Sequence, residues 1–241
     1  MGNSQKRLLG VIYPYDVDID DDLRKFLSDQ VSLVSSPTPG LTERATVKLL
    51  TSMAKDPEIE EAALQLLKFK PDCIAYTDTS ISFVRGVGYD REISERIRAR
   101  TGVVATTTST AMVRALRHLE IERVAAAAPY LAEVNEALVR FLEDSGFSVV
   151  KMVGLDLGEA EDVVGLSHDG ISHLGKSADV EEAEAIFVSC TALKTADIIE
   201  GLEEDLGKPV LTANQVTMWD ALRIMGVSDF HDGVGRLLSH A

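Results

Sequence analysis

The chain has 241 residues, of which 45% are hydrophobic and 26% are charged, and 39 acidic against 24 basic residues give a formal net charge of −15. This globular composition excludes a disordered or collagen-like chain, and no apolar run approaches the ~20 residues that a membrane span needs. A surface this acidic repels nucleic-acid phosphates and anionic membranes, so neither is expected as a partner.

The short polar segment from Met1 to Arg7 has no hydrophobic stretch of the signal-peptide type, so the expected location is the cytoplasm. Two cysteines without a secretory signal do not indicate a disulfide framework, and Cys73 and Cys190 are expected to be free thiols. Association into a homo-oligomer is compatible with these features, which leave the oligomeric state open.

Short runs rich in Val, Ile and Ala alternate with amphipathic stretches along the chain. The predicted strands are Leu8–Tyr13, Val31–Ser35, Asp72–Tyr76, Val103–Thr106, Val124–Ala127, Val149–Val153, Ala185–Ser189 and Pro209–Thr212. The predicted helices are Asp20–Leu27, Glu43–Ala54, Ile59–Leu67, Ile93–Arg100, Ala111–Leu119, Ala132–Asp144, Ala196–Leu206 and Thr217–Met225. Residues 156–162 and 165–178 are expected to be the least regular parts. Strands that alternate with helices predict parallel βαβ units and an α/β fold.

Three segments of the first half resemble segments of the second half in the same order. The matched pairs are Val11–Tyr15 with Ala126–Tyr130, Ile74–Thr79 with Ile186–Thr191, and Gly102–Thr106 with Lys208–Thr212, at offsets between 106 and 115 residues. Three matches at nearly one offset suggest an internal duplication. We therefore expect two pseudo-symmetric halves, residues 1–117 plus 218–241 and residues 118–217. Ligands of open parallel sheets sit beyond the carboxyl ends of the strands, which predicts a ligand between the halves, with Asp78 and Cys190 on opposite sides of it.

Cys190 ends an apolar strand, and the residues Thr191 to Thr195 that follow are predicted to open a helix. Free backbone N–H groups and the positive end of a helix stabilise a thiolate and lower the pKa of a thiol from ~8.5. The alternative is a buried structural cysteine. Cys73 lies within a strand, where core packing is the expected role.

The segment Thr77–Phe83 places several hydroxyl residues and an acid directly after a strand. Such hydroxyls and turn N–H groups can hold a carboxylate or an enediolate oxygen. Asp, Thr and Ser are also the preferred residues of a helix N-cap, which is the alternative interpretation. The match between Asp78 and Cys190 favours a site.

The five histidines do not cluster along the sequence, since His118 is in a predicted helix, His168 and His173 are in an irregular stretch, and His231 and His240 lie near the C-terminus. No spacing of His, Cys or Asp resembles a zinc site, and no glycine-rich phosphate loop is present. The simplest expectation is a mechanism without a metal or a nucleotide.

Several motifs together resemble the aspartate/glutamate racemase superfamily, and within it the arylmalonate decarboxylase and maleate cis–trans isomerase branch. They are Gly10–Pro14, Asp78–Gly86, Thr101–Ala111, Arg123–Tyr130, Ser189–Thr195 and Gly207–Arg223, which span nearly the whole chain. The resemblance implies two flavodoxin-like halves about a pseudo-dyad. It also implies an enzyme that works without cofactors on a carbon acid beside a carboxylate.

The resemblance further implies which residues form the site. Racemases and isomerases of this superfamily use a cysteine from each half, whereas the decarboxylase type keeps the second cysteine and has a small residue at the first position. Here the second position is Cys190 and the first is Asp78. Carried over by position, the residues that hold the substrate or its enediolate are Pro14, Tyr15, Thr79, Ser80, Tyr130 and the backbone N–H of Thr191.

Asp78 fits neither pattern, since it is neither a cysteine nor a small residue, and an ionised carboxylate there would repel a dicarboxylate substrate. Asp78 is therefore protonated, or the substrate carries a cation, or Asp78 is itself a catalytic base.

The leading hypothesis is a decarboxylase that stabilises the enediolate of a small dicarboxylate and reprotonates it from Cys190. The alternative is a racemase or a maleate-type isomerase that uses Asp78 and Cys190 as an acid/base pair, on an amino-acid or ectoine-derived substrate. A third hypothesis is a non-catalytic binding protein. Pocket size is expected to depend on loops 36–45 and 154–170.

Overall fold

The computed structural model describes residues 6–41, 43–228 and 232–239, and its strands form two separate sheets. The first sheet consists of β1 (Arg7–Pro14), β2 (Val31–Thr38), β3 (Cys73–Tyr76) and β4 (Ala105–Thr107). The second consists of β5 (Arg123–Ala128), β6 (Ser148–Gly154), β7 (Ala185–Val188) and β8 (Val210–Thr212). All of these strands pair in parallel, and every predicted strand is present.

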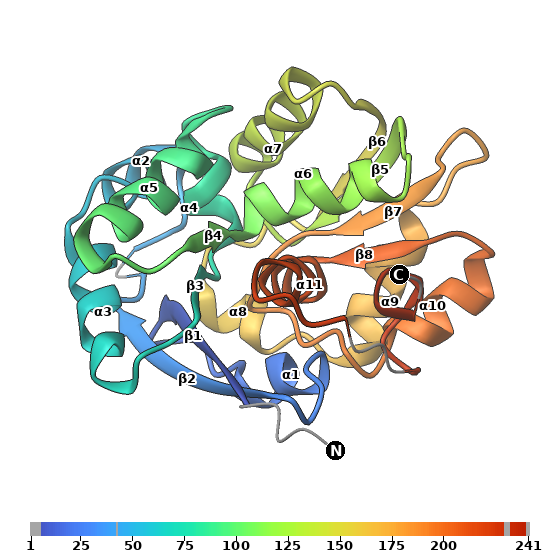
Figure 1. The fold of residues 1–241 in the computed structure, drawn as a ribbon. Helices are drawn as coiled ribbons and strands as arrows, with labels where there is room; N and C mark the ends of the chain where they lie inside the picture. The colour runs from blue at the N-terminus through green and yellow to red at the C-terminus, as the bar shows by residue number, and fades with distance from the viewer. Residues whose placement is uncertain (1–5, 42, 229–231, 240–241) are drawn as a thin grey trace, which may run out of the picture.

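The two sheets repeat one topology. Their strand orders are β2-β1-β3-β4 and β6-β5-β7-β8, so each strand of the first sheet has a counterpart four strands later. This is the order of flavodoxin-like sheets, in which the first two strands are exchanged. The predicted α/β fold of two pseudo-symmetric halves is confirmed, and Figure 1 shows the two sheets side by side.

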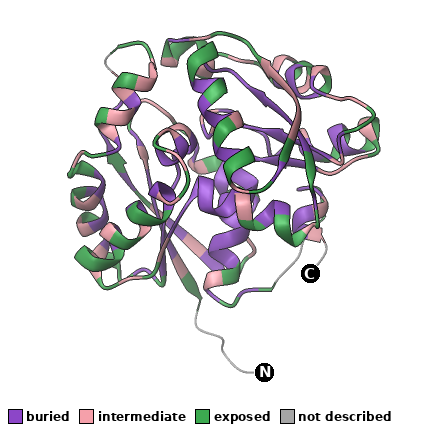
Figure 2. Cartoon of the chain, turned by 90° about the horizontal axis from the view of Figure 1, so that it is seen from above, coloured by how far each residue is buried: buried purple, intermediate pink, exposed green. Residues whose placement is uncertain are grey.

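The strands show the burial that their positions in the sheets require. The inner strands β3 and β7 are buried at every residue, which explains why both are continuous apolar runs. The edge strand β2 instead mixes buried and exposed positions, and it tolerates Pro37 because an edge strand need not donate every N–H group. Helices cover the outer faces of the sheets, and Figure 2 shows their inner sides buried and their outer sides exposed.

The helices begin and end as follows. In the first half they are α1 (Asp20–Lys25), α2 (Val47–Met53), α3 (Glu58–Leu66), the short 3₁₀ helix η1 (Leu67–Phe69), α4 (Thr79–Phe83), α5 (Tyr89–Thr101) and α6 (Thr108–His118). The remainder are α7 (Ala132–Asp144), α8 (Ala160–Val164), α9 (His168–Ser177), α10 (Ile199–Leu206), α11 (Ala213–Ile224) and α12 (Arg236–Ser239).

Two helix predictions are corrected by the structure. The stretch 165–178, expected to be irregular, contains α9, whose N-terminus is capped by the Ser167 hydroxyl accepting from the N–H of Gly170. The predicted helix after Cys190 begins only at Ile199, so a long turn separates the thiol from the helix. The sequence preferences failed at both places because capping and tertiary hydrogen bonds outweigh composition in short segments.

Helices α6 and α11 are symmetry-equivalent elements that meet at the centre of the molecule (Figure 1). Each begins directly after the last strand of its sheet, and each is capped by a threonine, Thr107 or Thr212, that accepts from a backbone N–H of the first turn. These caps start both helices several residues earlier than the apolar periodicity predicted. The Thr217 hydroxyl donates to that of Thr108 across the contact, at 2.9 Å.

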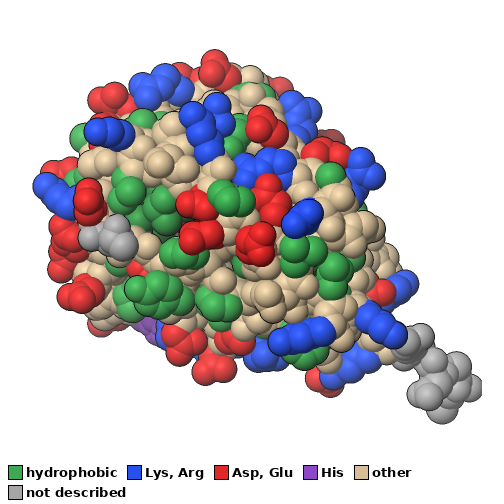
Figure 3. All heavy atoms as spheres, turned by 90° about the vertical axis from the view of Figure 1, so that its left-hand side faces the viewer, with side chains coloured by type: hydrophobic (Ala, Val, Ile, Leu, Met, Phe, Trp, Pro, Cys, Tyr) green, Lys and Arg blue, Asp and Glu red, His purple; other side chains and the backbone are tan. Residues whose placement is uncertain are grey.

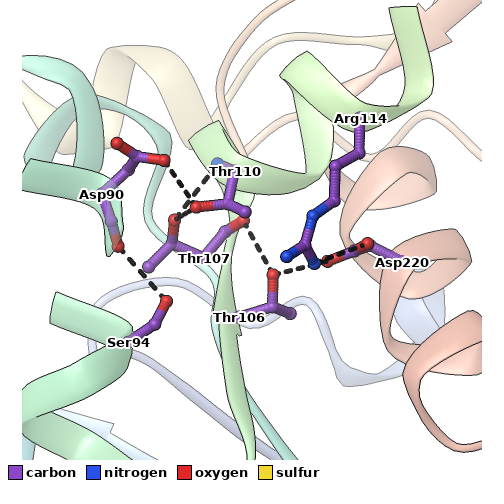
Figure 4. A network of polar contacts seen from close by, with 7 residues as sticks. All are labelled: Asp90, Ser94, Thr106, Thr107, Thr110, Arg114 and Asp220. Carbon is purple, nitrogen blue, oxygen red and sulfur yellow. Dashed lines mark hydrogen bonds and ion pairs between the residues drawn. The ribbon is translucent and has the colours of Figure 1, made fainter. Parts of the chain in front are cut away.

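An ion pair between a buried carboxylate and a half-exposed arginine strengthens this contact. Asp220 on α11 is 3% exposed, and both of its oxygens accept from the Arg114 guanidinium of α6 at 2.9 and 3.1 Å. The Thr106 hydroxyl at the end of β4 also donates to Asp220, at 2.6 Å. Figure 4 shows this group next to a second one, in which Thr110 donates to Asp90. Hydrogen bonds between polar side chains therefore link α6, α11 and β4 at this contact.

Replacement of Asp220 by asparagine is expected to lower the free energy of unfolding by about 2 kcal/mol, because a charged acceptor of three hydrogen bonds becomes a neutral one with a single acceptor atom. Urea denaturation of the variant and of the wild-type protein measures the difference. Equal midpoints would show that the ion pair contributes nothing to stability.

The division of the chain into residues 1–117 plus 218–241 and residues 118–217 stays a prediction. The strands of the two sheets do fall on either side of residue 118, but α11 contacts α1, α6 and β3 of the first half as well as β8 of the second. Residues 229–231 and 240–241 lie outside the described part of the chain.

The face of the molecule drawn in Figure 3 interleaves Lys and Arg side chains with Asp and Glu side chains. Over the residues that the structure describes, none of the helices has the length and apolar character for crossing a bilayer.

Candidate active site

Residues of both halves line a cavity of about 80 Å³ beyond the carboxyl ends of the strands. One part of its wall is polar and is formed by Asp78, Thr79, Ser80, Tyr130, Cys190 and Thr191. A further part of the lining is apolar and is formed by Val17, Leu41, Leu50, Met53, Leu157 and Val163, and the acidic residues Asp16 and Glu159 also line the cavity. Loops 36–45 and 154–170, expected to control pocket size, both contribute to the apolar part. The lining therefore combines hydrogen-bonding groups with aliphatic side chains.

Asp78 reaches the cavity from the turn between β3 and α4. Its side chain caps α4, since Oδ1 accepts from the N–H of Ile81 at 2.9 Å and from the hydroxyl of Ser80 at 3.1 Å. The residue is only 9% exposed and lines the cavity. The two interpretations of the sequence are therefore compatible, because one oxygen caps the helix while the residue also lies at the cavity.

Burial raises the pKa of Asp78 from its ordinary 3.8 to about 6, and the negative charge of Asp16 adds to this effect. The hydrogen bonds from Ile81 and Ser80 oppose it. At neutral pH the carboxyl is mostly ionised, but a small further perturbation, such as a bound anion, protonates it.

This raised pKa predicts a pH-dependent stability. A carboxyl whose pKa is higher in the folded state stabilises the fold most below the unfolded pKa, and this contribution is lost as the pH rises through about 6. The shift corresponds to about 3 kcal/mol. Asp78→Asn, which can still cap α4, is therefore expected to match the wild type near pH 4 and to exceed its free energy of unfolding by up to about 3 kcal/mol above pH 7. Denaturation at several pH values measures this, and a difference that does not change with pH would contradict it.

Thr79 and Ser80 lie on the first turn of α4. The Thr79 hydroxyl is buried and makes no hydrogen bond within the described residues, although it lies near enough to the Tyr130 phenol to lower its pKa slightly. The Ser80 hydroxyl donates a hydrogen bond to the Asp78 carboxylate. Because a buried hydroxyl without a partner is unfavourable, Thr79 is available to a ligand in the cavity.

Tyr130 is positioned by three contacts. Its hydroxyl lies 3.2 Å from that of Ser189, its ring packs against Phe83 with centroids 6.1 Å apart, and its carbonyl accepts from the Asn135 amide at 2.9 Å. Burial holds the pKa of its phenol well above 10, and the nearby Cys190 adds to this shift. Tyr130 is therefore a protonated hydrogen-bond donor at the cavity.

Cys190 follows β7 with a φ of 104°, in the left-handed region that a residue with a side chain rarely adopts. The backbone N–H groups of Ala192 and Leu193 and the Tyr130 hydroxyl lie near enough to its sulfur to lower the pKa of the thiol, and the Leu193 N–H also donates to the Cys190 carbonyl at 3.2 Å. Strained backbone of this kind persists only where surrounding contacts impose it, and it concentrates at functional sites.

The expected lowering of the Cys190 pKa is wrong. Burial raises the pKa of this thiol from 9.0 to about 12, and the charge of Asp78 raises it further, while the N–H groups of Ala192 and Leu193 offset only part of the effect. The helix whose positive end was expected to lower it begins nine residues later, at Ile199. At neutral pH Cys190 is a protonated thiol, which is the state that a proton donor requires.

The structure places the other predicted site residues differently. Pro14, Ser80 and Thr191 line the cavity, whereas Tyr15 is 69% exposed and is not part of the lining. Cys73 is fully buried in β3, which confirms its expected place in the core. Asp16, which the sequence reasoning missed, lines the cavity beside Pro14.

Among the described residues, no group of three or more His, Cys, Asp or Glu side chains is arranged to hold a metal ion. His231 and His240 lie outside the described part of the chain.

Comparison with known proteins identifies the family. A family model described as arylmalonate decarboxylase matches residues 51–238. The arylmalonate decarboxylase of Bordetella bronchiseptica is 30% identical over 186 residues, which cover 76% of this chain and 78% of that protein. The chain belongs to the arylmalonate decarboxylase family.

Other known proteins of the same branch are also similar to this chain. A maleate isomerase of Pseudomonas putida is 26% identical over 194 residues, which cover 78% of each chain. The liganded crystal structure of an arylmalonate decarboxylase double mutant, with one glycine changed to cysteine and one cysteine changed to serine, superposes with a TM-score of 0.89. It is 27% identical, and the match covers 98% of this chain and 100% of that one. The resemblance drawn from the sequence motifs is confirmed, and the chain is an enzyme of the decarboxylase and isomerase branch of the superfamily.

Proposed function

We propose that this enzyme decarboxylates a small dicarboxylate through an enediolate, without a cofactor, and that Cys190 protonates the resulting carbanion. The observation that carries the proposal is the mixed lining of the cavity. Hydrogen-bonding side chains line it together with Cys190, and aliphatic side chains form much of the remaining lining.

The polar and the apolar lining residues have different roles in the reaction. The donors are the hydroxyls of Thr79 and Tyr130 and the N–H of Thr191, and they hold the carboxylate that remains. The second carboxylate lies against aliphatic side chains, where poor solvation favours its loss as CO₂. The electron pair of the broken C–C bond moves into the retained carboxylate and forms an enediolate, whose charge the donors stabilise.

Cys190 completes the reaction. Its S–H proton passes to the carbon of the enediolate, and the N–H groups of Ala192 and Leu193 stabilise the thiolate that remains until it takes a proton from water. The carbon of an enediolate is strongly basic, so a thiol with a pKa of about 12 can still transfer its proton to it. Asp78, with a pKa of about 6, takes up a proton when the dianion binds, so that it does not repel the substrate.

A second candidate function is proton transfer at both faces of a carbon, with Asp78 and Cys190 as the acid/base pair of a racemase or isomerase. A carboxyl with a pKa of about 6 is well matched to act as a base at neutral pH. The acidic residues Asp16, Asp78 and Glu159 line the cavity, and its described lining contains no Lys, Arg or His. This charge favours a substrate with an ammonium group, such as an amino acid, over a dianion.

One experiment separates the two functions. The enzyme is incubated in D₂O with aryl- and alkylmalonates, with maleate and with amino acids, and CO₂ and deuterium incorporation are measured. Release of CO₂ with one deuterium per product supports the decarboxylase. Deuterium exchange without CO₂ supports the racemase or isomerase, and no reaction across the panel leaves the hypothesis of a binding protein open.

A further inference from the structure

The turn from Thr191 to Ile198, between β7 and α10, contains the N–H groups of Ala192 and Leu193 that lower the pKa of the Cys190 thiol, and it has no helix or strand of its own. Two buried side chains from other elements hold it. Asp22 on α1 is 4% exposed, and Asn214 on the first turn of α11 is 1% exposed. The two helices contact each other, with α11 at the centre of the molecule and α1 below it in the view of Figure 1.

Asp22 uses both carboxylate oxygens. Its Oδ1 accepts from the backbone N–H of Ala196 at 3.0 Å, and its Oδ2 accepts from the side-chain amide of Asn214 at 2.8 Å. An exposed ion pair between Lys25, on the same helix, and Asp197 reinforces this link between α1 and the turn. A residue of the first half therefore contacts the segment that follows the catalytic thiol of the second half.

Asn214 extends the link towards Cys190. Its side-chain nitrogen also lies 3.1 Å from the carbonyl of Thr191 and 3.2 Å from that of Leu193. Along the chain, these carbonyls lie before and after the N–H groups of Ala192 and Leu193, which lower the pKa of the Cys190 thiol, and the Leu193 N–H donates to the Cys190 carbonyl at 3.2 Å. The two side chains thus hold the turn at residues 191, 193 and 196, and this fixes the direction in which those N–H groups point.

We infer that Asp22 and Asn214 are positioning residues that hold the turn after Cys190 in the conformation required for proton transfer. The inference rests on the proposed role of Cys190 for its catalytic part, and on the hydrogen bonds alone for its structural part. The positive φ of Cys190 supports it, because such a backbone needs contacts from outside the segment to persist. The burial of a carboxylate is itself unfavourable, and here it is compensated by hydrogen bonds to the turn and to Asn214.

The chain offers a matched control in Asp220. It is also a buried aspartate, and it lies on the same helix as Asn214, but its hydrogen bonds go to Arg114 and Thr106. Asp22→Asn and Asp220→Asn therefore make the same chemical change in two buried networks. Only the first network includes the turn.

Hydrogen exchange followed by mass spectrometry tests the structural part. In Asp22→Asn, the amides of peptides covering residues 190–198, and that of Ala196 above all, are expected to exchange about tenfold faster than in the wild type, with the other segments unchanged. In Asp220→Asn, exchange in 190–198 is expected to stay at the wild-type rate. Asn214→Ala, which introduces no new polar group, provides the same test if Asp22→Asn does not fold.

Unchanged exchange in 190–198 in both Asp22→Asn and Asn214→Ala would overturn the inference. An equal acceleration in every segment would also overturn it, since that is the result of a general loss of stability. These readouts need no substrate, so they are independent of whether the proposed reaction is found.

Steady-state kinetics with the substrate found in D₂O tests the catalytic part. Asp22→Asn is expected to lower kcat about tenfold or more and to change KM much less, because a misplaced proton donor affects the chemical step rather than binding. Asp220→Asn is expected to keep the wild-type kcat. Faster exchange in 190–198 with an unchanged kcat would show that the two residues hold the turn without positioning the donor.

Discussion

Cys190→Ala is expected to lower turnover by about 10²–10⁴-fold, the usual effect of removing a general acid, while the protein remains folded. The reason is that the thiol is protonated at neutral pH and lies at the cavity among the donors that would stabilise the enediolate. Turnover is measured by CO₂ release or by deuterium incorporation in D₂O. Thermal unfolding of the same variant shows whether the fold is kept.

The matched control for this experiment is Cys73→Ala. Cys73 is fully buried in β3, and burial raises the pKa of its thiol to about 12, but it is a core residue and does not line the cavity. Its loss is expected to reduce stability, by about 1 kcal/mol for the small cavity that it leaves, and to keep the reaction rate. Full activity of Cys190→Ala would contradict every catalytic hypothesis for this site.

Asp78→Gly is expected to keep or improve decarboxylation, with KM for the dianionic substrate lower by up to about tenfold. The reason is that the variant removes a carboxyl that is ionised at neutral pH and has to be protonated before a dianion binds. Glycine still serves as an N-cap for α4 at a small cost in stability. Steady-state kinetics on the malonate identified in D₂O measures the effect, and Asp78→Asn separates the loss of charge from the loss of the side chain.

The opposite result is equally informative. If Asp78→Gly falls to background on a malonate, then the carboxyl takes part in the reaction, and the acid/base pair of Asp78 and Cys190 becomes the better mechanism. In that case the pH–rate profile should show an acidic limb near pH 6, where Asp78 loses its proton. Asp78→Cys would then supply the cavity with a thiol from each half and should raise racemisation.

The fold explains why these two residues line one cavity. Asp78 follows β3 and Cys190 follows β7, and the two strands occupy the same place in sheets of identical order. Parallel sheets expose turn N–H groups and side chains beyond the carboxyl ends of their strands, where ligands bind. Both edges contribute residues to the same cavity, so the residue at either position can change without a change of the architecture.

Much of this arrangement could be predicted from the sequence. The buried runs of β3 and β7 read as parallel strands because both faces of an inner strand are covered, which leaves an uninterrupted apolar signal. The repeated motifs at nearly constant offset predicted two equivalent halves, and the equivalence of Asp78 with Cys190 predicted a shared cavity. These features depend on local composition and on order along the chain, and both are fully present in the sequence.

The tertiary structure alone decided the chemistry of the site. Burial set the pKa of Cys190 to about 12 and that of Asp78 to about 6, and burial depends on residues far away in the sequence. In the sequence, Asp22 lies in an acidic run typical of a helix N-terminus, and Asn214 lies within a helix-capping motif, so neither residue indicated a role at the site. Their hydrogen bonds to the turn after Cys190 span 174 and 23 residues, so no local pattern could reveal them. Desolvation and long-range hydrogen bonding arise only when the chain is folded, which is why the sequence located the site but misjudged the protonation of its thiol.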